Sequence, residues 1–251
     1  MRKILLSISI ALSLVSCKSV LQVAHVEKNK NTNITDTIPS DKKVEAFILP
    51  YKTDLEKHMT VKLSYSPIEL TKMGTNSHLG NLLADYMYEA GNEWLMKNHQ
   101  KPADAALLNI GGIRNSIDKG DILVRNIFEV MPFENEVILV KFKGKDLEGL
   151  FQYYEKTQKN NPVSRLNIEV KDGKLTKAWV NGQPVHPEQD YYIVTSDYLA
   201  LGGDNMSFFS KGEHIATGIK LRDVFLEKFK ANHPLKFGEV EQRLLFQNNT
   251  K

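Results

Sequence analysis

The stretch LLNIGGIRNSI, residues 107–117, ends an apolar run with polar and conformationally permissive residues. The apolar segment before it, AALLNI, predicts a short buried strand. Gly111 and Gly112 permit positive φ and a close approach of ligand to backbone, because they carry no Cβ. Asn109 offers donors and an acceptor, and Arg114 offers a planar fork of donors. The pattern predicts a strand that ends in a binding loop; alternatively, Asn109 caps the turn and Arg114 pairs with a surface carboxylate.

The segments around this stretch predict a mixture of helices and strands. Residues 77–100 are expected to form a helix with Ser77 as N-cap, because apolar residues recur every three or four positions. Residues 137–154 predict a strand, a turn at Gly144 and a second helix. The other expected elements are three short strands within 166–185, a strand that ends at Gly202-Gly203, a last helix over 224–231 and a final strand over 241–246. The fold class is therefore α+β, with β-hairpins and mixed sheets.

Composition limits the classes of function. The chain has 251 residues, 41% of them hydrophobic and 25% charged, enough for one substantial globular domain. Without residues 1–16, which hold two of the 33 basic residues and no acidic ones, 31 basic residues face 30 acidic ones. This balance gives no electrostatic reason to expect nucleic acid as a partner. The seven histidines lack metal-site spacing and there is one cysteine, so we expect no metal and no cofactor in this chain.

The first residues predict where in the cell the protein is located. Residues 1–16 have a basic tip and a short apolar run, as in a signal peptide, and LVSC resembles the lipobox of bacterial lipoproteins. Cys17 is then the lipidation site and holds the protein on a membrane of the bacterial envelope, facing the periplasm or the cell surface; alternatively, the cysteine is incidental. Residues 17–43, rich in Asn, Thr and Lys, predict a flexible tether, and 44–247 the folded domain.

Four motifs in order carry a family resemblance. The segments LGNLLADYMYEA, NIGGIRNSI, EVMPFENEVILVKFKGKDLEGLF and DYLALGGDN together resemble the C-terminal domain of the 5'-nucleotidase family, which includes UDP-sugar hydrolases. The resemblance runs from about residue 63 to 246. Each motif alone is weak, but their joint occurrence in the family's order is specific. The resemblance implies the fold of that domain, made of layered helices and mixed sheets.

The resemblance also implies a cradle for a nucleotide or nucleoside. Phe133 and Tyr198 are expected to face each other and stack on the two sides of the base, and Asp204 to accept hydrogen bonds from the ribose hydroxyls. Alternatively, the rings belong to the core and Asp204 is an ordinary turn residue. The complete set of expected binding residues is Asn109, Gly111, Gly112, Arg114, Phe133, Tyr198, Gly203 and Asp204.

The sequence departs from the family pattern before the first motif. Met73 and Asn76 stand where the family commonly has an arginine and an acidic residue. Lys72 is adjacent and could replace the arginine, although an ammonium group cannot reproduce the planar fork of donors. This departure bears on affinity and on substrate choice.

The expected activity depends on a catalytic part that these residues do not supply. Family enzymes hydrolyse phosphate esters with two metal ions, held by a metallophosphoesterase domain with Asp-x-His and Gly-Asn-His signatures, and neither signature occurs in this sequence. We expect no catalytic residues here. The chain would be the substrate-recognition half of a 5'-nucleotidase in nucleotide catabolism, working with a separately encoded metallophosphoesterase that holds divalent metals. The alternatives are an envelope protein that only binds nucleotides or nucleosides, and a scaffold with a vestigial pocket.

Overall fold

The structure is a computed structural model that describes residues 23, 25–28 and 30–248. Cys17 and the expected signal peptide lie outside the described residues. The chain divides into two units, residues 1–48 and 49–251, and the sheets and core clusters belong to the second. Helix α2 (Lys42–Met59) crosses this division and has no buried residue. The expected domain start at residue 44 stays a prediction.

No helix in the described part of the chain has the length and apolar character needed to cross a membrane.

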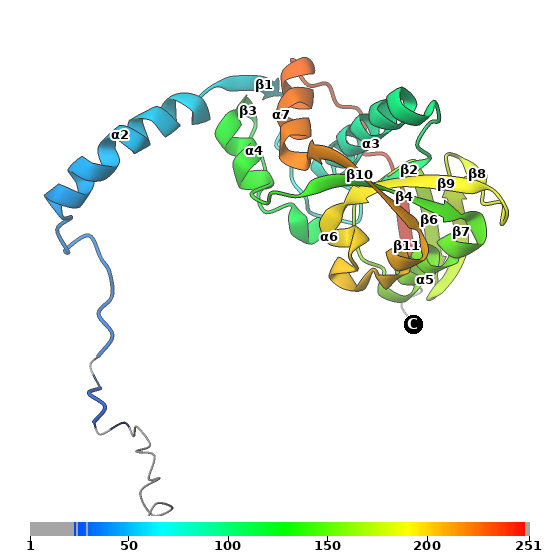
Figure 1. The fold of residues 1–251 in the computed structure, drawn as a ribbon, viewed down its shortest axis with the longest axis horizontal. Coiled ribbons are helices and arrows are strands. Elements are labelled where there is room, and N and C mark those ends of the chain that lie inside the picture. The colour runs from blue at the N-terminus through cyan, green and yellow to red at the C-terminus, as the bar shows by residue number, and fades with distance from the viewer. Residues whose placement is uncertain (1–22, 24, 29, 249–251) are drawn as a thin grey trace, which may run out of the picture. The chain divides into compact units, whose positions relative to one another are not determined.

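A five-stranded mixed sheet forms the centre of the second unit, in the order β10-β4-β9-β2-β5. Figure 1 labels four of these strands, β10, β4, β9 and β2. β2 and β9 run parallel, and the other neighbouring pairs are antiparallel. The strands are β2 (Ala105–Leu107), β4 (Glu136–Lys143), β5 (Val163–Ser164), β9 (Asp190–Ser196) and β10 (Glu213–Lys220).

Side chains of these strands alternate between two hydrophobic clusters, one on each face of the sheet. In β4, Val137 and Leu139 belong to the first cluster, whereas Ile138 and Val140 belong to the second. Successive residues of a strand point to opposite faces, so both faces of the sheet are buried. This explains why β4 reads as a continuous apolar run in the sequence.

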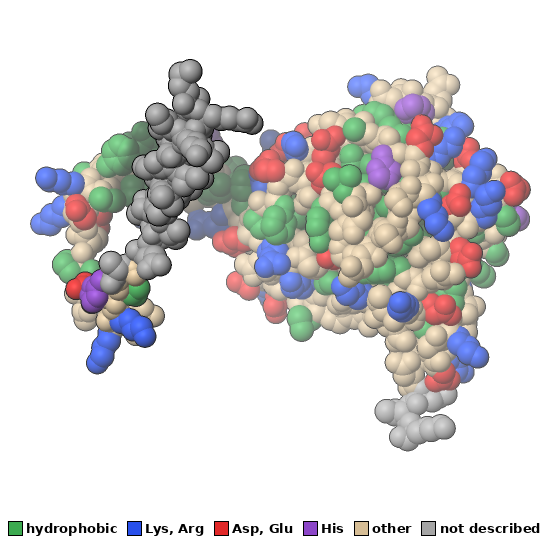
Figure 2. Space-filling model, turned by 60° about the horizontal axis from the view of Figure 1, so that its bottom comes forward, with side chains coloured by type: hydrophobic (Ala, Val, Ile, Leu, Met, Phe, Trp, Pro, Cys, Tyr) green, Lys and Arg blue, Asp and Glu red, His purple; other side chains and the backbone are tan. Residues whose placement is uncertain are grey.

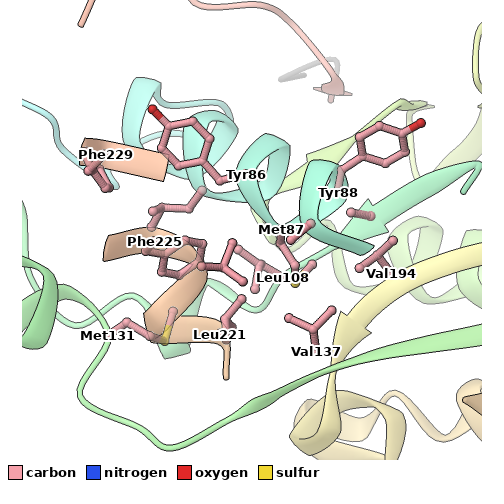
Figure 3. Close-up of a cluster of buried hydrophobic side chains, with 14 of the residues drawn as sticks. Tyr86, Met87, Tyr88, Leu108, Met131, Val137, Val194, Leu221, Phe225 and Phe229 are labelled. Carbon is pink, nitrogen blue, oxygen red and sulfur yellow. The ribbon is translucent and has the colours of Figure 1, made fainter. Parts of the chain in front are cut away.

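Helices cover the first face of the sheet. The helices are α3 (His78–His99), α4 (Val124–Val130) and α7 (Leu221–Ala231). Figure 3 shows Met87 of α3 and Phe225 of α7 in one cluster with Val137 and Val194 of the sheet. The ribbon of β1 (Lys62–Ser66) and β3 (Gly120–Leu123) adjoins this cluster through side chains that include Ile122.

The second face is covered by one helix and a second sheet. Helix α5 (Glu148–Thr157) follows β4 through the short helix η2 (Gly144–Leu147). The second sheet has the order β11-β6-β7-β8, with β6 (Leu166–Lys171), β7 (Lys174–Val180), β8 (Gln183–Pro184) and β11 (Leu244–Gln247). The predicted fold class, α+β with mixed sheets and hairpins, is confirmed.

Helix α3 confirms the predicted helix together with its cap. The Ser77 side chain accepts a hydrogen bond from the Gly80 N–H at 3.0 Å, and Gln100 ends the helix in the left-handed region at φ 54°. A Cβ on Gly91 would lie 2.5 Å from a methyl group of Val194. The glycine therefore lets α3 approach the middle of the sheet.

Two details of the sequence-based prediction are wrong, and one permitted conformation is not used. Gly111 and Gly112 permit positive φ but do not adopt it, because they form the short 3-10 helix η1 (Ile110–Gly112). The strand expected to run to the Gly-Gly pair ends at Ser196, and the short helix α6 (Asp197–Ala200) intervenes because the Ser196 side chain caps it. The last helix begins at Leu221, three residues before the expected start.

An ion pair between the buried Arg243 and the partly exposed Asp85 holds the C-terminal segment against α3. Arg243 is 8% exposed, and its two terminal nitrogens each donate to a different oxygen of Asp85 at 2.8 Å. It also donates to the Val163 carbonyl at 2.7 Å, while the Ser164 hydroxyl donates to Asp85 at 2.6 Å. The bidentate geometry fixes β11 beside β6, and no sequence motif predicted it.

One face of the second unit carries mixed charge. On the face drawn in Figure 2, Lys and Arg side chains lie among Asp and Glu side chains. Exposed large apolar side chains include Phe133 at 44%, Tyr198 at 45% and Leu201 at 83%. The first two of these line a pocket.

Candidate functional site

The predicted binding residues lie on segments that follow or precede three strands at one edge of the central sheet. β2 and β9 are parallel, so their C-terminal ends lie at the same edge. Ser196 at the end of β9 pairs with Val137 at the start of antiparallel β4, so the loop before β4 reaches that edge too. The Thr195 hydroxyl donates to the Leu107 carbonyl at 2.9 Å and joins the ends of β9 and β2. The topology therefore brings together loops that are far apart in the sequence.

A pocket of about 350 Å³ lies between these loops. It is lined by Asn109, Gly111, Gly112, Arg114, Phe133, Asn135, Tyr198 and Asp204. Seven of the eight predicted residues are in this lining, and the eighth, Gly203, lies against Tyr198. The volume is within the range of small-molecule sites, roughly 300 to 1,000 Å³.

Gly111 keeps the floor of the pocket open. A Cβ placed there would lie 3.7 Å from Asn109 Nδ2 and 4.0 Å from Asp204 Oδ2, with nothing closer. A Cβ on Gly112, in contrast, would lie 2.8 Å from Asn109 Oδ1. Glycine at 111 leaves space between two polar side chains, and glycine at 112 makes room for one of them.

The contacts of Asn109 and Arg114 differ from the alternatives in which Asn109 caps the turn and Arg114 pairs with a surface carboxylate. Asn109 precedes η1 but makes no side-chain capping hydrogen bond. Arg114 forms no ion pair within the described part of the chain, and donates instead to the Gly111 carbonyl at 3.1 Å. Its guanidinium lies 5.9 Å from the centre of the Phe133 ring, at the limit of a cation–π contact. Both side chains therefore keep donors for a ligand.

The loop that carries Phe133 is held by Arg222 of α7. The Arg222 guanidinium donates to the Pro132 carbonyl at 3.1 Å and the Phe133 carbonyl at 3.4 Å, and pairs with the Glu134 carboxylate. It also lies 4.3 Å from the Phe128 ring centre. The exposed ring of Phe133 is thus presented by a fixed backbone.

Tyr198 and Asp204 form one polar unit on the other side of the pocket. The Tyr198 hydroxyl donates to Asp204 Oδ1 at 2.9 Å and accepts from the Asp204 N–H at 3.2 Å. Asp204 has φ 51°, in the left-handed region. A Cβ on Gly203 would lie 2.5 Å from Tyr198 Cζ, so only glycine allows the ring this position. The second carboxylate oxygen of Asp204 remains for a ligand.

Sequence reasoning missed two residues of the site. Asn135 lines the pocket; its Nδ2 donates to Asp197 Oδ1 at 2.7 Å, which leaves its carbonyl oxygen as an acceptor. Asn135 lies two residues after Phe133 in the motif EVMPFENEVILVKFKGKDLEGLF, so this motif could have identified it as a candidate site residue. Arg222 had no sequence signal, because its partners are about ninety residues away.

Lys72, Met73 and Asn76, at and beside the positions that depart from the family pattern, have different surroundings. The Lys72 ammonium donates to the Ile113 carbonyl, beside Arg114, and is not among the residues that line the pocket. Met73 is 73% exposed. Asn76 accepts from the N–H groups of Arg243 and Leu244 at 3.0 Å each. Asn76 therefore ties down the C-terminal segment. Replacement of the family arginine by Lys72 stays a prediction.

No group of three or more His, Cys, Asp or Glu side chains with metal-binding geometry occurs among the residues that the structure describes. The lining of the pocket offers amide, guanidinium, carboxylate and ring groups, which suit an organic polar ligand with a flat part.

The fold and the pocket define an α+β domain with a candidate ligand site on loops at a sheet edge. A family profile described as "5'-nucleotidase, C-terminal domain" matches residues 58–211. The chain belongs to this family.

This chain is similar to part of several proteins. Protein UshA of Escherichia coli is 30% identical over 146 residues, covering 56% of this chain and 26% of UshA. The 5'-nucleotidase of Vibrio cholerae is 24% identical over 223 residues, covering 84% of this chain and 38% of that protein. The 5'-nucleotidase precursor of Thermus thermophilus has a similar structure, with a TM-score of 0.68 at 24% identity, covering 84% of this chain and 44% of that one. The chain thus spans less than half of each of these proteins.

Proposed function

We propose that this chain recognises nucleotides as the substrate-binding part of a 5'-nucleotidase system. The observation that carries the proposal is the pocket itself, in which two half-exposed rings, one guanidinium, two amides and one carboxylate come together. Phe133 and Tyr198 stack on the base, and Asp204 accepts from the ribose hydroxyls. Arg114 is the cation for the phosphate. Stacking contributes ~1 to 3 kcal/mol per base and tolerates different bases.

Asn135 adds a means of reading the base in this proposal. Its amide nitrogen donates to Asp197, which fixes the direction of its carbonyl oxygen. This oxygen can accept a hydrogen bond from a donor on the ligand. An exocyclic amino group of a base supplies such a donor. The residue lies on the same loop as Phe133, and both line the pocket.

Hydrolysis in this proposal takes place on a separate metallophosphoesterase chain with two divalent metal ions. The support is the sequence, in which neither metal-binding signature of that domain occurs, and the pocket, which offers recognition groups but no cluster of metal ligands in the described residues. Two metal ions would activate water and stabilise the leaving oxygen on the partner. The task of this chain is to hold the nucleoside so that the phosphate reaches them.

Attachment to the bacterial envelope through a lipid on Cys17 is part of the same proposal. It rests on the LVSC sequence and on the polar segment that follows. Mass spectrometry of the protein from membranes tests it, since a diacylglyceryl-modified N-terminal cysteine is expected. An unmodified residue 17 in the membrane-purified chain would contradict it.

Binding is tested by calorimetry with AMP, UMP, UDP-glucose and adenosine. We expect heat of binding with the nucleotides, and a Phe133→Ala variant that weakens AMP and UMP similarly. Trp179→Ala is a matched control, because Trp179 is an exposed ring at 38% on β7 and is not among the pocket residues. A folded protein that binds none of the four compounds would refute the proposed function.

The catalytic part of the proposal is tested by mixing. Phosphate release from AMP is expected when this chain, a metallophosphoesterase encoded by a neighbouring gene and a divalent metal are combined. Release by the pure chain alone would contradict the division of labour. Tight nucleotide binding with no activity in any mixture would favour a pure binding protein.

A further inference from the structure

A second cavity adjoins the nucleotide pocket and shares Asp204 with it. It has a volume of about 320 Å³ and is lined by Tyr153, Lys156, Thr157, Lys159, Asp204 and Asn205. The proposed function uses only the first pocket, so the second cavity has no role in it.

The loop geometry explains how one residue reaches both spaces. Gly202, Asp204 and Asn205 have φ values of 92°, 51° and 63°, so three of four consecutive residues are in the left-handed region. This conformation is unfavourable for residues other than glycine and persists where surrounding contacts hold it. Here the two hydrogen bonds between Tyr198 and Asp204 hold it. Asp204 thus forms a shared wall between the cavities.

The polar groups of the second cavity favour an anion. Lys156 and Lys159 are exposed and form no ion pair in the described part of the chain, although their place at the C-terminal end of α5 suits the helix dipole. The Tyr153 hydroxyl accepts from Asn161 Nδ2 at 3.1 Å, which leaves its own proton for another acceptor. Burial raises the pKa of Tyr153, and the nearby Asp204 carboxylate adds to the rise, so the phenol stays a donor.

We propose that this cavity is a subsite for a second phosphate, carried on the 2' or 3' oxygen of the ribose, and that the chain binds nucleoside bisphosphates. The proposal rests on the proposed function, in which the ribose hydroxyls lie at Asp204. Because Asp204 lines both cavities, a group attached to one of those oxygens would extend toward the second cavity, while the other hydroxyl still donates to Asp204. The Asp204 carboxylate opposes the phosphate, but the Tyr198 hydroxyl occupies one of its oxygens, and the two lysine charges exceed its single charge.

Two isomeric ligands test the position of the second phosphate. Adenosine 3',5'-bisphosphate and ADP have the same composition, but only the first places a phosphate on the ribose 3' oxygen. With calorimetry on the folded chain, we expect the 3',5'-bisphosphate to bind roughly tenfold more tightly than AMP, as fits charge-assisted hydrogen bonds at a partly exposed site.

Lysine variants test the residues. Lys156→Gln with Lys159→Gln should remove the tenfold gain and leave AMP and ADP binding unchanged. The matched control is Lys171→Gln with Lys174→Gln, two exposed lysines at the β6–β7 turn, which should change nothing.

The outcomes separate this inference from the proposed function. If AMP binds but the 3',5'-bisphosphate gains nothing over it, the subsite is overturned while nucleotide recognition stands. If the Lys156 and Lys159 changes weaken AMP and the bisphosphate by the same factor, the lysines act on the whole nucleotide and the subsite is again overturned. If AMP itself does not bind, both proposals fail.

Discussion

Replacing Gly91 by alanine should destabilise the domain, although alanine is the better helix former. Gly91 lies on the buried side of α3, where a Cβ would lie 2.5 Å and 2.6 Å from the two methyl carbons of Val194. Carbon atoms in contact are ordinarily about 3.5 to 4.0 Å apart, so α3 or β9 must move by about 1 Å. Overpacking of this kind typically costs ~1 to 3 kcal/mol.

Helix propensity acts in the opposite direction, and the magnitudes decide the sign. Alanine in a helix interior is favoured over glycine by ~0.8 to 1 kcal/mol. We therefore expect a net loss of roughly 1 to 2 kcal/mol in the free energy of unfolding for Gly91→Ala. Urea unfolding followed by circular dichroism measures it, with a lower midpoint and an unchanged slope.

A double-mutant cycle with Val194→Ala isolates the contact. That change alone should cost roughly 2 kcal/mol, because it removes buried methyl groups. In its background the Gly91→Ala change should become neutral or stabilising, which gives a coupling energy above about 1 kcal/mol. A Gly91→Ala protein that is more stable than the wild type by the propensity difference would refute the packing explanation.

Three further predictions concern the ion pair, the pocket and acid stability. Arg243→Lys should lower the free energy of unfolding by ~1 to 3 kcal/mol in thermal or urea unfolding, because the bidentate bond to Asp85 is lost while the positive charge remains; wild-type stability would contradict this. Tyr198→Phe should weaken AMP binding by less than about tenfold in calorimetry, since stacking remains while the hydrogen bonds to Asp204 are lost; a loss of all binding would mean that the hydroxyl contacts the ligand. Lys143 and Lys141 of β4 lower the pKa of the Asp190 carboxyl. The ionised carboxylate therefore stabilises the fold above the ordinary Asp pKa of about 4, and this stabilisation is lost as pH falls through the lowered pKa of the folded state. Asp190→Asn should therefore flatten the acid side of the stability–pH curve, and an unchanged curve would argue against the ion pairs.

The sequence was sufficient for the elements whose signals are local. Helix α3 was predicted with its cap at Ser77, because a capping side chain and a period of three to four residues need no information from elsewhere in the chain. The strand, turn and helix from β4 to α5 were predicted for the same reason. The predicted binding residues were named from motifs, and seven of the eight line one pocket.

Tertiary structure decided what depends on distant contacts. Arg222 fixes the Phe133 loop, and Arg243 fixes the last strand, through partners about 90 and 158 residues away in the sequence. The tertiary structure also decided that Gly111 and Gly112, which permit positive φ, form a 3-10 helix instead.

The amino-acid sequence by itself determined helix α3, the strand and helix from β4 to α5, and the chemical groups available for binding, because spacing and side-chain type act over a few residues. Only the tertiary structure decided that three loops meet at one sheet edge, that the Tyr198 hydroxyl is bonded to Asp204, and that a second cavity lies behind that carboxylate. The physical reason is that strand order and register set distances between groups, and these are fixed by burial of the whole sheet and not by any local segment.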